Sequence, residues 1–285
     1  MSLRLPDGAE LPVFDVHQHY GALVMSSAGA EERVGAGDQD DHSDRLERMQ
    51  RLGVDAALLM PVNRYLRPRG AADTRDHNDR LAAYRALDPA RFPVAVGVAE
   101  PLHGSAGLDE IRRVRDEHAF VGISSHARWQ GVAADDPWIL RQLELMGELS
   151  MLPFVHAHSD STLESPSIVA NLAAAFPDLP IVVTDAGSSP AQLIAFTAEL
   201  ERHENLHLET SLIFHPRQIE QLVARFGADR LVFGSDLYSR GVHCTLNSPE
   251  ALAETGLDSE SLRAVLHGNA QRLLAWAGAN VELAC

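Results

Sequence analysis

Two short motifs place pairs of histidines two residues apart. The first is His17-Gln18-His19, and the second is His156-Ala157-His158. Side chains two apart on a β-strand point to the same face, so each pair can direct two imidazoles at one ion. The chain contains 14 histidines, and a single histidine at a strand end is more often a hydrogen-bonded packing residue. One pair alone is therefore weak support for a metal site.

Two aspartates end apolar runs elsewhere in the chain. Asp185 closes the run PIVVTD, and Asp236 closes RLVFGSD. Either carboxylate could bind a metal, or it could simply cap the helix that follows it. The joint pattern favours metal binding, because two or three imidazoles with a carboxylate form a site for a divalent transition metal. The pattern predicts one divalent ion, with zinc as the first choice and manganese or iron as alternatives.

The rest of the sequence predicts how these groups can meet. Short β-branched runs alternate with amphipathic stretches of about ten to fifteen residues, which is typical of βα units around a parallel sheet. The runs stand at 12–17, 54–60, 92–98, 120–125, 152–157, 180–185, 206–210 and 230–236. Eight such units in 285 residues predict an α/β fold, the (β/α)8 TIM barrel. A doubly wound open sheet is the alternative, but the turn after the first run lacks its glycine-rich fingerprint.

In such a barrel, pockets lie at the carboxyl ends of the strands, where the histidines and aspartates fall. Asp136-Pro137 and Ser189-Pro190 are typical helix starts, and residues 258–278 are expected to form a last helix. No long repeat or low-complexity tract interrupts the chain, which predicts a single domain over residues 1–285. The Gly-, Ala- and Ser-rich stretch 21–41 is long for a βα loop, so we expect either a mobile linker or a lid.

The charge balance excludes several functions. Forty acidic residues against 24 basic ones give a net charge of −16, which leaves no general basic field for a nucleic-acid backbone. Every basic residue is arginine, so Schiff bases, P-loops and a carboxylated lysine between two metals are excluded. The two cysteines, Cys244 and Cys285, form no Cys-x-x-Cys pair. Because the start carries no apolar leader, we expect a cytoplasmic protein that is neither secreted nor bound to a membrane.

Five segments together resemble the amidohydrolase superfamily. In order along almost the whole chain, they are FDVHQHYG, GISSHARWQGVAADDP, PFVHAH, FGSDLY and LHGNAQRLLAW. They are most similar to the branch of single-metal TIM-barrel enzymes that includes aminocarboxymuconate semialdehyde decarboxylase. The resemblance implies that His17, His19 and His156 bind the metal, and that Asp236 is a further ligand or the proton acceptor beside it.

The chain departs from this family at two positions. The family commonly has a lysine in the fourth strand, where this chain has Ser124, so the resemblance implies one metal and not a bridged pair. It also commonly has a histidine at the end of the sixth strand, where this chain has Asp185. A carboxylate there either joins the metal ligands or takes up a proton at raised pKa, and His158 could supply the imidazole. We therefore expect Asp236, Asp185 and His158 to be catalytic.

Loop residues just beyond the strands are candidates for substrate binding. Arginine can hold a carboxylate through two hydrogen bonds, and Trp or Tyr can stack on a planar ring. Surface arginines can also simply pair with the many acids of this chain. Arg128 is the first candidate, because it follows the fourth strand beside His126. The full set comprises Arg64, Arg67, His126, Arg128, Trp129, His215, Tyr238 and Arg240.

These features predict a metal-dependent hydrolase that acts on a small carboxylic ester, lactone or amide. The first alternative is a non-oxidative decarboxylase of a small unsaturated or aromatic acid, which would use the same ligands. The second alternative is a barrel that binds a metal or small ligand without turnover. The expected partner is a small carboxylic acid derivative, with no nucleic acid and no membrane. Barrels of this sort often pair, so a homodimer is one assembly to test.

Overall fold

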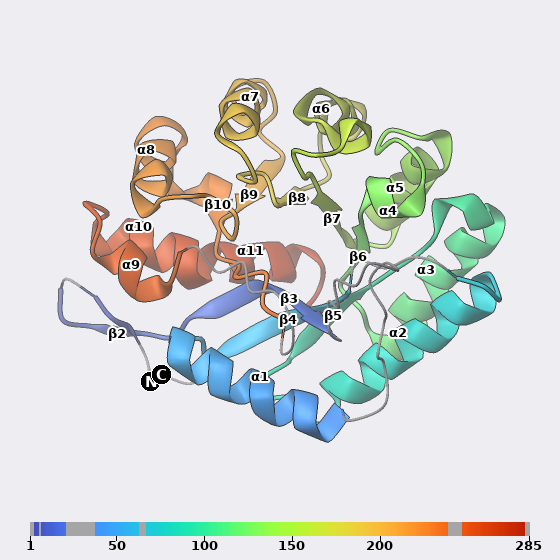
Figure 1. Ribbon diagram of the computed structural model, residues 1–285, viewed down its shortest axis with the longest axis horizontal. Coiled ribbons are helices and arrows are strands. Elements are labelled where there is room, and N and C mark those ends of the chain that lie inside the picture. Colours follow the sequence, from blue (N-terminus) through green and yellow to red (C-terminus); the bar gives the residue numbers. More distant parts are fainter. Residues whose placement is uncertain (1–2, 6, 21–37, 63–66, 239–246, 283–285) are drawn as a thin grey trace.

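The computed structural model describes residues 3–5, 7–20, 38–62, 67–238 and 247–282. At its centre is a sheet of eight parallel strands, in which each strand pairs with its neighbour in the sequence (Figure 1). These strands are β3 (Phe14–Tyr20), β4 (Ala56–Pro61), β5 (Val94–Gly97), β6 (Gly122–Ser125), β7 (Leu152–His156), β8 (Ile181–Thr184), β9 (Leu206–Glu209) and β10 (Leu231–Val232). Each predicted strand overlaps one of them. A short antiparallel hairpin, β1 (Leu3–Arg4) with β2 (Glu10–Leu11), precedes the barrel and was not predicted.

Helices follow the strands and surround the barrel (Figure 1). They are α1 (Asp38–Leu52), α2 (Ala71–Arg85), α3 (Ser105–His118), α4 (Ala127–Gln130), α5 (Pro137–Glu148), α6 (Pro166–Ala175), α7 (Pro190–Leu200), α8 (Pro216–Phe226), α9 (Pro249–Ala253), α10 (Ser259–Arg263) and α11 (Asn269–Trp276). Short turns add η1 (Pro101–His103), η2 (Thr162–Glu164), η3 (Ala228–Arg230) and the π-helical η4 (Ala264–Gly268). No helix in the described ranges is both long and apolar enough to cross a membrane.

The two proline-marked helix starts are confirmed. Asp136 caps α5 by accepting a hydrogen bond from the amide of Trp138, and Ser189 caps α7 through the amide of Gln192. The helix predicted over 258–278 is divided by η4 into α10 and α11. Most of the stretch 21–41, predicted as a linker or lid, lies outside the described residues, and α1 begins at Asp38.

Hydrogen bonds between β3 and the segment after β10 close the sheet into a ring. The amide of Val16 donates to the carbonyl of Phe233 (3.0 Å), and the amide of His19 donates to the carbonyl of Leu237 (2.9 Å). The amide of Leu237 donates in turn to the carbonyl of His17 (3.3 Å). The predicted (β/α)8 barrel is therefore confirmed.

Alternate strand residues form an apolar cluster inside the ring. Phe14 of β3 and Phe154 of β7 belong to it, and so does Leu273 of α11. Arg115, in α3, donates from Nη1 to the carbonyl of Ala277 just beyond α11 (3.2 Å). Helix α11 therefore crosses the amino-terminal end of the barrel and closes it. The opposite end, where the strands finish, carries the predicted site.

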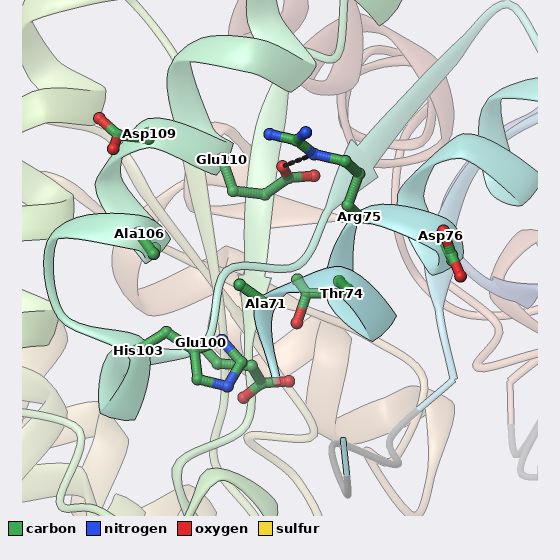
Figure 2. A pocket seen from close by; sticks show the side chains of 11 residues that line it. Ala71, Thr74, Arg75, Asp76, Glu100, His103, Ala106, Asp109 and Glu110 are labelled. Carbon is green, nitrogen blue, oxygen red and sulfur yellow. Dashed lines mark ion pairs between the residues drawn. The ribbon is translucent and has the colours of Figure 1, made fainter. Parts of the chain in front are cut away.

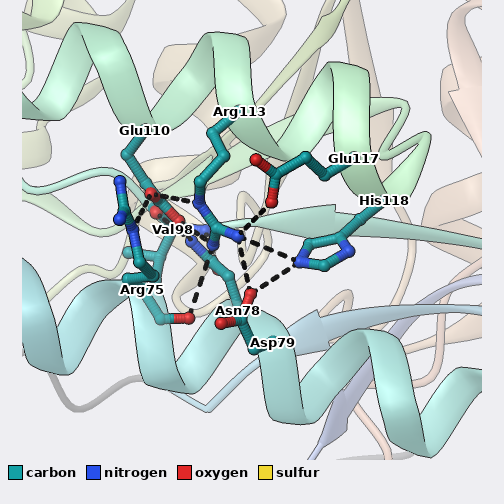
Figure 3. Close-up of polar contacts among 8 residues, drawn as sticks. All are labelled: Arg75, Asn78, Asp79, Val98, Glu110, Arg113, Glu117 and His118. Atoms are coloured by element: carbon teal, nitrogen blue, oxygen red, sulfur yellow. Dashed lines mark hydrogen bonds and ion pairs between the residues drawn. The ribbon is translucent and has the colours of Figure 1, made fainter.

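A polar network joins α2, α3 and the exit of β5 (Figure 3). Asn78 donates from Nδ2 to the carbonyl of Val98 (2.9 Å) and to Oε1 of Glu110 (2.8 Å). Arg113 donates to the same Glu110 oxygen from Nη2 (2.7 Å) and to Oδ1 of Asp79 from Nη1 (2.7 Å). Because the buried Asn78 and Glu110 bond to each other, the two helices are held in a fixed relation.

Asp15 ties the first strand of the ring to the last. Its carboxylate accepts hydrogen bonds from Ser235 N (3.0 Å), Ser235 Oγ (2.5 Å) and Gln18 Nε2 (2.8 Å). Burial raises the pKa of Asp15 to about 6, although the hydrogen bonds from Ser235 and Gln18 oppose this shift. Gln18 lies between the two histidines of the first motif, and Ser235 precedes Asp236. Asp15 therefore positions candidate site residues on both strands.

We expect Asp15→Ala to lower the free energy of unfolding by about 3 kcal/mol or more, because it removes the buried carboxylate that accepts hydrogen bonds from Ser235 and Gln18. Denaturant unfolding followed by circular dichroism measures this loss. Asp7→Ala is the matched control, since Asp7 pairs with Arg263 at the surface and such a pair contributes about 1 kcal/mol or less. Equal losses for the two variants would show that Asp15 does not stabilise the closure of the ring.

Candidate metal centre

A register shift in β3 turns both histidines of the first motif into the barrel. Phe14 and Val16 belong to the inner cluster, so a regular strand would point His17 and His19 outward. The pairing of β3 with β4 shifts between Asp15 and Gln18. Such an irregularity re-aims the side chains that follow it, which places both imidazoles inside.

Three imidazole rings meet at the carboxyl end of the barrel. The ring centroid of His17 lies 4.8 Å from that of His19 and 5.3 Å from that of His156. The ring centroids of His19 and His156 are 5.6 Å apart. The Nε2 atoms of His17 and His19 are 2.9 Å apart. All three residues are fully buried. One nitrogen of each ring lies within 4.8 Å of the others, a spacing that suits one bound cation.

Backbone carbonyls orient two of these rings. His19 donates from Nδ1 to the carbonyl of Pro61 (2.6 Å), and His156 donates from Nδ1 to the carbonyl of Ser125 (3.2 Å). A proton on Nδ1 leaves the lone pair on Nε2, which is the form of histidine that binds a metal. The neighbouring strands β4 and β6 thus set both the tautomer and the direction of the rings.

Glu209, at the end of β9, orients the third ring and was not predicted. Its Oε2 accepts hydrogen bonds from Nδ1 of His17 (2.8 Å) and from Oγ of Ser211 (2.7 Å). Glu209 is fully buried, and a side chain at Gly234 would collide with its carboxylate. Glu209 is the last residue of β9 but stands one residue before the end of the run LHLET, whereas Asp185 and Asp236 end their runs. Such a carboxylate–histidine pair strengthens metal binding by the far nitrogen.

Arg45 of α1 supports β3 from the outer side and was also missed. It is fully buried and donates from Nη2 to the carbonyl of His19 (2.6 Å). Its Nε donates to the hydroxyl of Tyr84 (3.0 Å). A buried guanidinium with these partners fixes the backbone that carries the first histidine pair.

Asp185 and Asp236 bring two carboxylates to the same point. Oδ1 of Asp236 lies 3.1 Å from Nε2 of His19 and 3.4 Å from Nε2 of His17. Oxygen atoms of Asp185 and Asp236 and a nitrogen of His17 all lie within 4.8 Å of one another. Both aspartates adopt left-handed backbone conformations, with φ of 61° and 52°. Aspartate tolerates this region better than most residues, and such strain clusters at functional sites.

Neither aspartate caps a helix within the described ranges. Helix α7, which follows Asp185, is capped by Ser189. The next described helix after Asp236 is α9, which is capped by Ser248. Asp185 therefore does not cap α7, and the position of both carboxylates beside the histidines favours a role in ion binding.

The donor atoms fit a divalent cation. Nε2 of His156 and Oδ1 of Asp185 are buried and have no hydrogen-bond partner in the described part of the chain. An unsatisfied buried polar atom costs about 1–3 kcal/mol, so their convergence with the other two histidines suits a cation bound between them. Imidazole nitrogens combined with carboxylate oxygens are ligands for zinc, manganese and iron.

The charges in this cluster also favour a cation. Burial lowers the pKa of His17, but the carboxylates of Glu209 and Asp236 more than offset this effect and raise it to about 10. Burial and the charge of Asp236 raise the pKa of Asp185 well above its usual value. Burial keeps the pKa of His156 well below its usual value, so this ring is neutral and offers a lone pair. Without an ion, protons on His17 and Asp185 relieve the repulsion between the carboxylates.

His126 lies directly beside the three histidines. Its ring stacks on His156 with centroids 4.6 Å apart and an interplanar angle of 4°. Its Nδ1 donates to Oε2 of Glu164 (2.9 Å), a fully buried carboxylate that the sequence did not single out. Glu164 also accepts hydrogen bonds from the amides of Arg128 (3.3 Å) and His158 (3.2 Å). It belongs to the short turn η2, where no periodic pattern marks a functional residue.

Arg128 and His158 meet at the rim. Nδ1 of His158 lies 2.6 Å from Oδ1 of Asp160, and Arg128 bonds to the same oxygen. The side chains of Arg128 and His158 are 25% and 32% exposed. Strand β7 ends at His156, so the alternation that would have placed His158 on the same inner face stops before it. The structure does not bring His158 into the ring cluster, and its catalytic role stays a prediction.

The two aromatic candidates for substrate binding, Tyr238 and Trp129, differ in burial and in their neighbours. Tyr238 is buried and stacks on His19, with ring centroids 4.5 Å apart and an interplanar angle of 19°. Trp129 is 39% exposed, and the guanidinium carbon of Arg128 lies 5.0 Å from its ring centroid. Tyr238 therefore packs against a candidate ligand, whereas Trp129 offers a surface at the rim.

Arg67 forms an ion pair with Glu100, which lies just beyond β5. Its Nε is 3.5 Å from Oε1 of Glu100. Burial raises the pKa of Glu100 to about 7, although Arg67 opposes this shift. Glu100 lines a pocket of about 350 Å³ between α2 and α3, together with residues such as Thr74 and His103 (Figure 2). None of the predicted metal ligands lines this pocket, so it is separate from the cluster.

His215 caps a helix, and its contact with substrate stays a prediction. It is exposed, and its side chain caps α8 by accepting a hydrogen bond from the amide of Arg217. Arg64 and Arg240 lie outside the described residues, and their contact with substrate stays a prediction.

Binding of Mn²⁺ to the metal-free chain should release protons. At pH 7 His17 carries a proton that the cation would displace, and the raised pKa of Asp185 adds to this release. Because the metal-free chain holds more protons than the metal-bound chain, raising the pH from about 6 to about 8 should strengthen binding at least about tenfold. Calorimetric titration in buffers of different ionisation enthalpy measures the protons released. An affinity that does not change with pH would contradict this prediction.

The comparisons with known proteins agree with this geometry. The amidohydrolase family model (Amidohydro_2) matches residues 14–276, whereas no curated protein matches significantly. 4-Oxalomesaconate hydratase from Rhodopseudomonas palustris has a similar structure, with a TM-score of 0.70 and 16% identity over 93% of this chain and 96% of that chain. 2,6-Dihydroxybenzoate decarboxylase from Rhizobium has a TM-score of 0.67 and 19% identity, over 93% and 99%.

A third structure contains a metal. Dihydroxybenzoic acid decarboxylase from Polaromonas, with bound manganese and the inhibitor 2-nitroresorcinol, has a TM-score of 0.67 and 19% identity over 93% of this chain and 97% of that chain. At these identities the structural likeness shows the shared fold. The family model, in contrast, extends from β3 to the end of α11 and so contains every predicted metal ligand. This chain belongs to the amidohydrolase family, as its motifs predicted.

Proposed function

We propose that the chain is a metal-dependent hydrolase that cleaves a small carboxylic ester, lactone or amide. The observation that carries the proposal is the meeting of buried nitrogens of His17, His19 and His156 with the Asp236 carboxylate at the carboxyl end of the barrel. These four residues would hold one divalent ion, with zinc as the first expectation. The manganese in the Polaromonas decarboxylase makes that ion the alternative.

Hydrolysis at such a site needs an activated water and a proton acceptor. A divalent ion would polarise the carbonyl under attack and lower the pKa of its water from about 16 to about 7. Asp236, whose Oδ1 lies 3.1 Å from Nε2 of His19, would accept the proton of the attacking water and pass it to the leaving group. Glu209 keeps His17 oriented throughout, because its bond is to the nitrogen that faces away from the ion.

Residues near the rim would bind the substrate. Arg128 can hold a carboxylate through two hydrogen bonds if it exchanges its partner Asp160 for the substrate. Trp129 offers a flat surface beside it, and His126 lies between this rim and the metal ligands. We propose that Tyr238, stacked on His19, contacts the bound substrate from the other side, and that His158 assists proton transfer at the rim.

Wild-type protein purified with metal supplied should contain close to one divalent ion per chain by elemental analysis. Replacing His17 and His19 together by Ala should abolish metal retention, because two of the three imidazoles are lost. Circular dichroism should show that the barrel is still folded. His215→Ala, at an exposed helix cap, is the control and should retain the ion. Stoichiometric metal in the double variant would show that the ligands lie elsewhere.

Asp236→Asn should lower kcat at least about a hundredfold on any ester, lactone or amide that the wild type hydrolyses, because the amide cannot accept the proton. A panel of small carboxylic acid derivatives, assayed by release of acid, identifies such a substrate. Asp178→Asn, at an exposed acid near the opposite end of the barrel, is the control. Near-wild-type turnover by Asp236→Asn would remove this residue from the mechanism.

Decarboxylation is the second candidate, and the two decarboxylases among the similar structures favour it. The same ligands would then hold the oxygens of a small unsaturated or aromatic acid. Release of carbon dioxide without incorporation of labelled oxygen from water identifies this reaction, whereas incorporation into the product acid identifies hydrolysis. A chain that holds its ion but turns over no member of either panel would be a binding protein.

A further inference from the structure

We infer that Asp185 binds the ion directly, which completes a site of three imidazoles and two carboxylates. This inference rests on the proposed metal site and concerns the position where the family commonly has a histidine. It assigns Asp185 a contact with the metal that the resemblance to the family does not supply.

The environment of the Asp185 carboxylate points to a cation. Asp185 is 5% exposed, and its Oδ1 has no hydrogen-bond partner in the described part of the chain. Its oxygen lies in one group with a nitrogen of His17 and an oxygen of Asp236, all within 4.8 Å. A buried carboxylate is normally satisfied by N–H or O–H donors or by a positive charge. Here its near neighbours are another carboxylate and the nitrogen of a candidate ligand.

The backbone holds Asp185 in this position. The amide of Ser188 donates to the carbonyl of Asp185 (3.0 Å), which forms a tight turn directly after β8. Within the turn, a Cβ at Gly187 would lie 2.6 Å from Cα of Ile213, so the turn packs closely against the segment after β9. Together with the left-handed conformation of Asp185, this packing leaves the carboxylate little freedom to turn toward solvent.

A second carboxylate would change which metal the site prefers. Two carboxylates neutralise the charge of a divalent cation, and oxygen ligands suit manganese, whereas imidazole suits zinc. A histidine at this position would instead give four imidazoles and one carboxylate. Asp185 is therefore expected to raise the affinity for Mn²⁺ relative to Zn²⁺ above that of a variant with an imidazole at this position.

The test uses the full-length chain after removal of metal by a chelator, with MnCl₂ as the probe. Asp185→Asn should raise the Kd for Mn²⁺ at least about tenfold, measured by the electron paramagnetic resonance signal of the unbound ion. Asparagine tolerates the left-handed conformation at least as well as aspartate, so the turn should be kept. Asp160→Asn is the matched control, because this carboxylate lies at the same rim but bonds to Arg128 and His158, and its Kd should stay within twofold of wild type.

Asp185→His gives a second measurement that does not depend on the folding of the asparagine variant. The ratio of the Kd for Mn²⁺ to the Kd for Zn²⁺, from competition with a chelating dye, should rise at least about tenfold in this variant. A Kd for Mn²⁺ within twofold of wild type in Asp185→Asn, or an unchanged ratio in Asp185→His, would overturn the inference. If the wild type itself binds neither ion, the proposed metal site fails before Asp185 is tested.

Discussion

Repulsion among buried carboxylates is the constraint on which the rest of this structure depends. Asp185, Asp236 and Glu209 lie around His17 in a region that water hardly reaches. Buried charges of one sign are tolerated only when protons or a cation compensate them. The neutral nitrogen of His156 cannot supply that charge. The proton on His17, or a cation bound in its place, therefore has to compensate these carboxylates.

Several residues that touch no ion are needed to keep this arrangement in place. The carbonyl of Pro61 and the carboxylate of Glu209 fix the direction of the first two rings. Asp15 holds the backbone on both sides of the closure between β3 and β10. Orientation of this kind typically changes metal affinity by about 10–100-fold when it is lost. The strain at the two left-handed aspartates is maintained by the same closely packed surroundings.

The meeting of the candidate ligands at one edge of the sheet could be predicted from the sequence because they obey local rules. His17 and His19 lie two apart, and Asp185 and Asp236 end apolar runs, so the parallel topology alone brings them to one edge. Glu209 and Asp15 could not be paired with their partners in this way, since their contacts join residues 192 and 220 positions apart. The inward turn of His17 also depends on a register shift that no spacing reveals. His158 was expected to share the inner face of its strand with His156. Because β7 ends at His156, the alternation of strand side chains does not extend to His158.

The closure of the barrel places His17 and Asp236 on opposite sides of one junction, in the first and last strands of the ring. During translation, the histidine pair leaves the ribosome long before the last strand has been synthesised. Contacts between such distant segments form late, because a long loop has to close first. A nascent chain can therefore offer isolated imidazoles to passing metals, but it gains the carboxylate of Asp236 only when the ring is complete. An incomplete chain thus lacks the full set of proposed ligands, which exists only once the last strand has joined the ring.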